Sequence, residues 1–294
     1  MGVDIRIALT LFTVLAPAGA LAYLFMALRI FIQPKRNEKT ELLEHFLMVP
    51  LGVSILGLIS SATHLGTPAN SLYVLMGWGR SPLSNEVTVA VIFLMLTGMY
   101  WLYSFVRSKR LPWLVVRFWL ISNCLAALWL VTMISVVYAI PTIPTWNSAL
   151  VPLELWVLAL STGPLLAAAI LSFMTPKAPR SYLLALLGIS ACAIVASLIV
   201  FSMKNVELNA ISNAWGSAHD LVPWYPLSIV TWAVLGVFGL LFIAVSVLRE
   251  QKDKSGAGFD KKTALFSFGG IALVFAGAIL IRIPFYMMHL TVGL

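Results

Sequence analysis

The chain has 294 residues, of which 61% are hydrophobic and only 10% are charged. Soluble domains average about 45–50% apolar and about 25% charged residues, so this composition excludes an ordinary soluble protein. The net charge of +8 does not indicate a nucleic-acid partner, because the basic residues gather at alternate ends of apolar runs.

Eight apolar runs are long enough to cross a hydrocarbon layer of about 30 Å, which takes roughly 20 helical residues. We therefore predict an all-α, polytopic membrane protein, with eight transmembrane helices in a bundle that forms one integral-membrane domain over residues 1–294. The expected helices cover residues 5–32, 43–65, 86–106, 112–139, 152–174, 181–203, 226–248 and 263–288.

The basic residues predict which ends of these helices face the cytoplasm. Of the 19 lysines and arginines, all but Arg6, Arg80, Lys204 and Arg282 lie in or beside the first, third, fifth and seventh connections. The positive-inside rule places these connections in the cytoplasm. Both termini and the even-numbered connections are then expected outside.

The first inside connection, residues 33–46, mixes charges of both signs and contains His45, and we expect a solvated helix start there. The first outer connection is richer in chemistry and reads HLGTPANSLYVLMGWGRSPLSNE over residues 64–86. His64 closes one expected span and Glu86 opens the next, and two glycine turn signals lie between them. The segment predicts a proton-handling pair at a membrane edge. For Glu86 the alternative is a carboxylate in the first helical turn, after Ser84 as N-cap.

The later outer connections contain further polar and aromatic candidates. Trp146 follows two prolines and is expected to be an interfacial anchor, with a lid over a ligand as the alternative. Glu154 falls in the first turn of its expected helix, where a carboxylate favours the helix dipole. Residues 203–226 have the character of a docking surface for another protein, and for the adjacent His219 and Asp220 we expect no catalytic role.

Arg282 lies about two turns inside the outer edge of the last span, where an arginine costs on the order of 2.5–3.5 kcal/mol. We expect it to face the bundle, either by snorkelling or by pairing with a buried carboxylate or a quinone oxygen. The unusual ionisable groups all fall in the outer half, which favours a one-sided site over a transport pathway through both leaflets.

Four motifs carry a resemblance to a known family. HLGTP at His64, LSNE before and at Glu86, PTIPTW ending at Trp146, and RIPFYMMHLTVG from Arg282 resemble the membrane-anchor subunit of the bacterial dimethyl sulfoxide reductase family. The similarity runs over nearly the whole chain.

The resemblance implies that menaquinol is oxidised in this chain and that its electrons pass to an iron–sulfur subunit, which feeds a molybdopterin catalytic subunit. The chain would then not catalyse the terminal reduction itself. It implies a heterotrimer in the bacterial inner membrane, with the partner subunits on the periplasmic face and both termini of this chain periplasmic. His64 and Glu86 are the implied catalytic residues. The candidates for the quinol pocket are His64, Gly66, Arg80, Glu86, Trp146, Arg282 and His289.

The chain's own residues limit its cofactors. Two cysteines cannot supply the four thiolates of an iron–sulfur cluster. Only His45 of the four histidines is expected inside, so no transmembrane histidine pair exists for haem, and we expect none to be bound. Two alternatives stay open: a purely structural anchor or assembly platform, and a secondary transporter.

Overall fold

A computed structural model describes residues 3–63, 68–106, 111–173, 178–213, 216–252 and 261–289. Within these ranges it confirms an all-α chain with eight helical segments long and apolar enough to cross a membrane. They are α1 (Val3–Phe31), α2 (Glu38–Phe46) with α3 (Met48–Ala62), α4 (Pro82–Tyr103), α5 (Trp113–Val137), α6 (Leu150–Phe173), α7 (Arg180–Ala210), α9 (Tyr225–Lys252) and α10 (Lys261–Met287).

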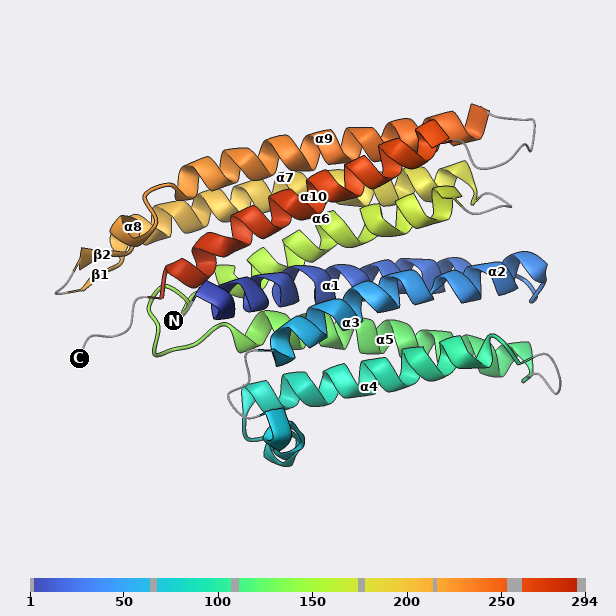
Figure 1. Cartoon of the computed structure of the whole chain (residues 1–294), viewed down its shortest axis with the longest axis horizontal. Coiled ribbons are helices and arrows are strands. Elements are labelled where there is room, and N and C mark those ends of the chain that lie inside the picture. Colours follow the sequence, from blue (N-terminus) through green and yellow to red (C-terminus); the bar gives the residue numbers. More distant parts are fainter. Residues whose placement is uncertain are drawn as a thin grey trace.

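Helix α1 is the central element of the fold. It packs against α3, α5, α6 and α10, and α6 packs in turn against α7. Figure 1 shows α1 between a group made of α3, α4 and α5 and a second group made of α6, α7, α9 and α10. Most of α1 is buried although it is uniformly apolar, because a helix surrounded by other helices needs no polar face.

Small residues let α1 approach its neighbours closely. A Cβ atom added at Gly57 of α3 would lie 2.5 Å from the backbone nitrogen of Ala16, and one added at Gly163 of α6 would lie 2.7 Å from the Cβ of Leu21. Ser60 of α3 also donates a hydrogen bond to the carbonyl oxygen of Ala8, at 3.0 Å. Close backbone contact and interhelical hydrogen bonds of this kind hold membrane helices together, since the hydrophobic effect does not favour helix contact over lipid contact.

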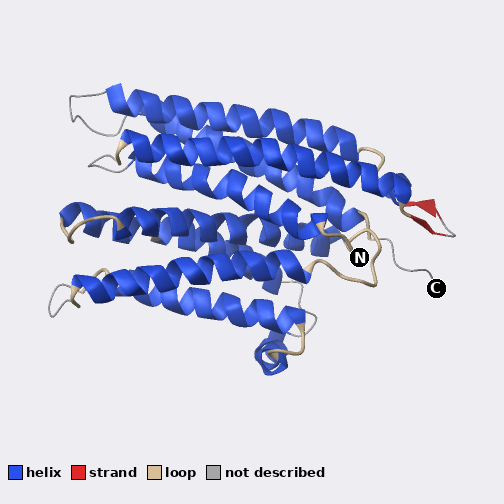
Figure 2. Ribbon diagram, turned by 180° about the vertical axis from the view of Figure 1, so that it is seen from behind, coloured by secondary structure: helices blue, strands red, loops and turns tan. Residues whose placement is uncertain are grey.

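The connections gather at two opposite ends of the molecule (Figure 2). One end, which we call the Glu86 end, carries the 3₁₀ helix η1 (Pro68–Gly77), the segment 138–149, and the short elements β1 (Ser212–Asn213), β2 (Gly216–Ser217) and α8 (Ala218–Leu221). The other end, which we call the Glu44 end, carries α2 and the first turns of α5, α7 and α10. These ends correspond to the expected outer and inner sides.

Helix α4 corrects one expected helix start. It begins at Pro82, with Ser81 as its N-cap, so Ser84 is not the cap and Glu86 lies beyond the first turn. Proline is favoured in the first turn because its missing N–H has no helical partner there. The interpretation of Glu86 as a first-turn partner of the helix dipole is therefore wrong.

Helix α6 gives a second correction of this kind. It begins at Leu150, and no acidic residue lies in its first turn. Glu154 therefore does not have the first-turn position that was expected for it.

Helix α7 is longer than expected and continues to Ala210, so the outer connection does not begin at residue 203. The extension carries Lys204, which is fully buried. Its ammonium nitrogen lies 2.7 Å from the carbonyl oxygen of Thr145 and 2.8 Å from Glu207 Oε2. These partners compensate the buried charge, so the polar sequence stays helical.

At the Glu44 end the expected solvated helix start is wrong for its carboxylate. Glu44 is fully buried, where Arg36 pairs with Oε2 and Tyr100 donates a hydrogen bond to Oε1 at 2.8 Å. Asn37 caps α2 by accepting a hydrogen bond from the Thr40 backbone N–H at 3.0 Å. This end therefore has a closed ionic cluster in which both carboxylate oxygens of Glu44 are used.

Candidate functional site

An apolar cavity of about 240 Å³ lies at the Glu86 end between α1, α3, η1 and α4. Its walls include Phe12 of α1, Leu58 of α3, Val74 of η1 and Leu83 of α4. Glu86 is the charged residue among the lining side chains, and it is only 4% exposed. Pockets for small organic ligands combine these features, namely apolar walls and few polar groups that fix the ligand's orientation.

The carboxyl group of Glu86 has no partner within the protein. Among the described residues no hydrogen bond or ion pair engages it, and its burial is the one environmental effect on it. Buried carboxylates are normally paired or hydrogen-bonded. Both oxygens of Glu86 are therefore available to a ligand in the cavity.

Tyr138, which follows α5, connects this region electrostatically with a second polar cluster. Burial raises the pKa of Tyr138 well above its ordinary value, and Tyr286 and the negative charge of Glu86 raise it further. The phenol therefore stays neutral, so that it can both donate and accept a hydrogen bond.

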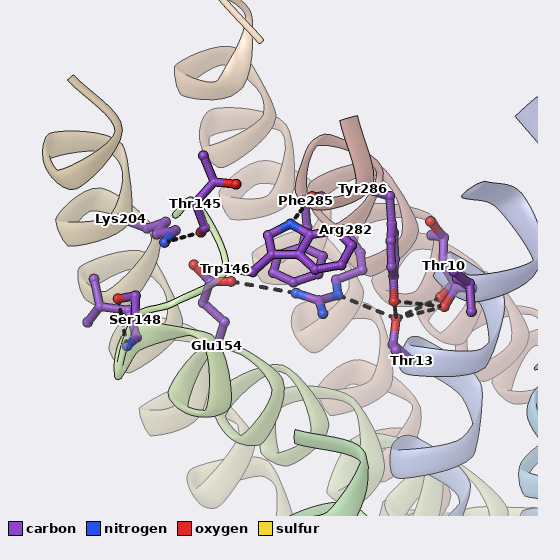
Figure 3. Close-up of polar contacts among 12 residues, drawn as sticks. Thr10, Thr13, Thr145, Trp146, Ser148, Glu154, Lys204, Arg282, Phe285 and Tyr286 are labelled. Atoms are coloured by element: carbon purple, nitrogen blue, oxygen red, sulfur yellow. Dashed lines mark hydrogen bonds and ion pairs between the residues drawn. The ribbon is translucent and has the colours of Figure 1, made fainter. Parts of the chain in front are cut away.

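The second cluster is centred on Arg282, which is 2% exposed (Figure 3). Its Nη1 atom lies 3.5 Å from Glu154 Oε2, and its Nε donates to Thr13 Oγ1 at 3.4 Å. Tyr286 donates to the same hydroxyl oxygen at 3.2 Å. The prediction that Arg282 faces the bundle and pairs with a buried carboxylate is confirmed, and snorkelling is excluded by this burial.

Trp146 covers this cluster. Its ring stacks on Phe285 with centroids 4.9 Å apart, and its Nε1 donates to the Phe285 carbonyl at 3.0 Å. The Phe285 ring in turn lies 3.6 Å from the guanidinium carbon of Arg282. Because Trp146 is only 5% exposed, the expectation of an interfacial anchor is wrong, and its place is that of a lid over buried charge.

The candidate residues separate into distinct places. Glu86 lines the cavity, whereas Trp146 and His289 lie together beside Arg282, with ring centroids 5.2 Å apart. Arg80 is exposed on the turn after η1. His64 and Gly66 fall outside the described residues, although Ser61 and Ala62, just before them in the chain, line the cavity.

Sequence reasoning missed several groups that complete the polar network. Tyr138 and Thr13 look like ordinary residues of apolar runs, and Lys204 looked like a loop residue. A useful signal was available for Thr13, because Thr10 and Thr13 lie one helical turn apart and share one face of α1. The described residues contain no group of three or more His, Cys, Asp or Glu side chains placed to hold a metal ion.

Residues 2–287 match the family described as DMSO reductase anchor subunit (DmsC). The chain belongs to the DMSO reductase anchor subunit family. It is 30% identical to a subunit of the anaerobic dimethyl sulfoxide reductase of Haemophilus influenzae, over 97% of this chain and 95% of the relative. It is 29% identical to the subunit of the same name in Escherichia coli, over 97% and 96%. It is also 29% identical to the Escherichia coli anaerobic dimethyl sulfoxide reductase chain YnfH, over 97% and 95%.

The family assignment confirms the resemblance found from the four motifs and the role of a multi-pass membrane anchor. Membership extends over both groups of helices around α1, so the cavity at Glu86 and the cluster at Arg282 belong to one family unit.

Proposed function

We propose that this anchor subunit oxidises menaquinol in the cavity at Glu86 and passes the electrons to an iron–sulfur subunit, which supplies a molybdopterin subunit that reduces dimethyl sulfoxide or a related S- or N-oxide. The observation that carries the proposal is a buried carboxyl group without a protein partner at the wall of an apolar cavity. A quinol is a mostly apolar ring with two hydroxyl groups, and each hydroxyl needs an acceptor for its proton.

In this proposal Glu86 accepts a proton from one hydroxyl and His64 accepts one from the other. A neutral imidazole has one unprotonated ring nitrogen that can accept a proton near neutral pH. The position of Ser61 and Ala62 in the cavity wall favours His64 as the second acceptor, because the chain reaches it only two residues later. The electrons leave to the partner, since the chain has only two cysteines and needs an external acceptor.

The charge pattern supports an orientation with the Glu86 end on the periplasmic side of the inner membrane. The partner subunits would then dock on that face, where the end of α7, the β1–β2 hairpin and α8 project beyond the other helices (Figure 1). Both termini would lie on the same side. The heterotrimer, the orientation and the absence of haem remain parts of this proposal.

Glu86→Gln tests the proposal in the assembled complex. We expect menaquinol-driven reduction of the terminal oxidant to be lost, while reduction driven by a soluble viologen dye continues, because the dye delivers electrons without the quinol site. Glu38→Gln is the matched control, since Glu38 is exposed at the opposite end. Normal menaquinol kinetics in the Glu86 variant would show that the cavity is not the oxidation site, and the chain would then be an anchor alone.

A further inference from the structure

The cluster around Arg282 contains buried polar atoms without partners. Among the described residues, Glu154 Oε1, Arg282 Nη2 and Thr10 Oγ1 are buried and make no hydrogen bond. The Glu154 to Arg282 distance of 3.5 Å is also long for a charge-assisted hydrogen bond. Buried polar atoms in native proteins are almost always satisfied by protein or by ordered water, so three such atoms in one place favour a hydrated cluster.

This cluster adjoins the cavity at Glu86. Phe12 lines the cavity, and its neighbour Thr13 accepts hydrogen bonds from Arg282 and Tyr286. The Tyr138 ring lies 5.8 Å from the Arg282 guanidinium carbon and its hydroxyl responds to the charge of Glu86. Tyr138 is therefore placed between the cavity and the cluster.

The cluster also leads to the protein surface. Glu154 interacts electrostatically with Lys204 and with Glu207. The Lys204 side chain is 1% exposed, whereas that of Glu207 is 30% exposed. Glu207 also accepts a hydrogen bond from Ser148 at 3.0 Å. In Figure 3, Lys204 and Ser148 lie on the side of Glu154 that faces away from Thr13.

We propose that Glu154 is a proton-relay residue that carries quinol protons from Glu86, past Tyr138, to the surface at Glu207. The relay rests on the proposed function, which supplies the quinol. Each menaquinol releases two electrons to the partner subunit and two protons to the chain. A proton taken by Glu86 passes through the Tyr138 hydroxyl and water to the Glu154 carboxylate, and then to Glu207 and solvent, so every group returns to its starting state.

Arg282 has a different role from the carriers. Its guanidinium stays protonated and cannot release a proton under these conditions, so it orients Glu154 and Thr13. The Trp146 and Phe285 rings cover it, which closes the direct way to solvent above Arg282 and leaves Glu154 as the polar exit.

A structural salt bridge between α6 and α10 is the competing explanation, and a pair of variants separates the two. In the assembled complex we expect Glu154→Gln to lower menaquinol-driven kcat by about 10- to 100-fold with KM little changed, and to raise the solvent deuterium isotope effect. The double variant Glu154→Gln with Arg282→Gln removes both charges together. If the pair only stabilises the fold, the double variant recovers the wild-type rate, and this result would overturn the relay.

Glu207→Gln keeps the test decisive if the buried variants fail to assemble, because the Glu207 side chain is partly exposed and tolerates substitution. We expect it to slow turnover less than Glu154→Gln and to raise the isotope effect in the same way. A wild-type rate and isotope effect in both single variants, alongside an inactive Glu86→Gln complex, would disprove the relay and leave the quinol site in place. An active Glu86→Gln complex would instead disprove the quinol site itself.

Discussion

The two ends of the molecule each bury a carboxylate, and they treat it in opposite ways. At the Glu44 end, Arg36 and Tyr100 occupy both oxygens of Glu44. At the Glu86 end, the carboxyl group of Glu86 faces an apolar cavity and has no partner among the described residues. A carboxylate whose oxygens are all used stabilises the fold, whereas an unpaired one costs free energy that only a ligand can offset.

Helix α4 joins the two ends, since it carries Glu86 near its start and Tyr100 near its end. The fourteen residues from one to the other correspond to about 21 Å along a helix. On the buried face of this stretch lie Val89, Ala90, Phe93 and Thr97, and the Thr97 hydroxyl donates to its own helix at the Phe93 carbonyl. The two carboxylates are thus separated by a layer without ionisable groups on α4.

The largest effect on stability is expected at the Glu44 end. Arg36→Ala leaves Glu44 buried without its cation, and breaking a buried ion pair costs about 3–5 kcal/mol. We expect a clear fall in the thermal unfolding temperature of the purified complex, with menaquinol turnover per folded complex unchanged. Lys35→Ala is the control because Lys35 is exposed next in the chain. An Arg36 variant as stable as the control would mean that Glu44 is held by Tyr100 alone.

A smaller effect on stability is expected at the Glu86 end. Glu86→Gln breaks no ion pair and no hydrogen bond, so its free energy of unfolding should change by less than about 1 kcal/mol. Glu44→Gln is the matched comparison, since it weakens hydrogen bonds to a charged group, which contribute about 1.5–3 kcal/mol each. The two variants are compared by thermal unfolding. Equal destabilisation would mean that Glu86 has a structural partner, and the contrast between the ends would disappear.

The sequence predicted the spans well and their ends less well. The spans follow from the length of apolar runs, a strong signal in a membrane protein. The end of α7 was missed because Lys204 looked like a loop residue, and its compensating partners Thr145 and Glu207 are visible only in three dimensions. The start of α4 was missed because Pro82 was taken as a helix breaker, although it occupies the tolerated first turn.

For the site, the sequence predicted the burial of Arg282 but did not identify its partner. The cost of an exposed arginine at that depth indicated that it faces the bundle, but Glu154 lies three spans earlier in the chain. Glu44 was missed for a different reason. It lies on a short helix among charged residues, where sequence patterns are typical of a solvated surface, and its burial depends on packing against α4.

The remaining prediction concerns an effect that should be absent: quinol oxidation by this complex is expected to be electroneutral. Glu86 and the segment proposed for docking, residues 203–226, lie at the same end of the molecule, so neither electrons nor protons have to cross the bilayer. Moving one charge through 100 mV is worth about 2.3 kcal/mol, which a one-sided site neither stores nor spends. The protons released at Glu86 would enter the compartment in which the oxide substrate takes up protons.

The measurement uses the complex in tight liposomes, driven by a menaquinol analogue, with a potential-sensitive dye. We expect turnover without a change in membrane potential, and the same turnover after addition of an uncoupler. An uncoupler-sensitive potential that follows turnover would mean that charge passes between the two ends. The apolar stretch of α4 between Glu86 and Tyr100 would then have to be bypassed through the interior around α1 and α6, and the Glu44 cluster would need a conducting role in place of a structural one.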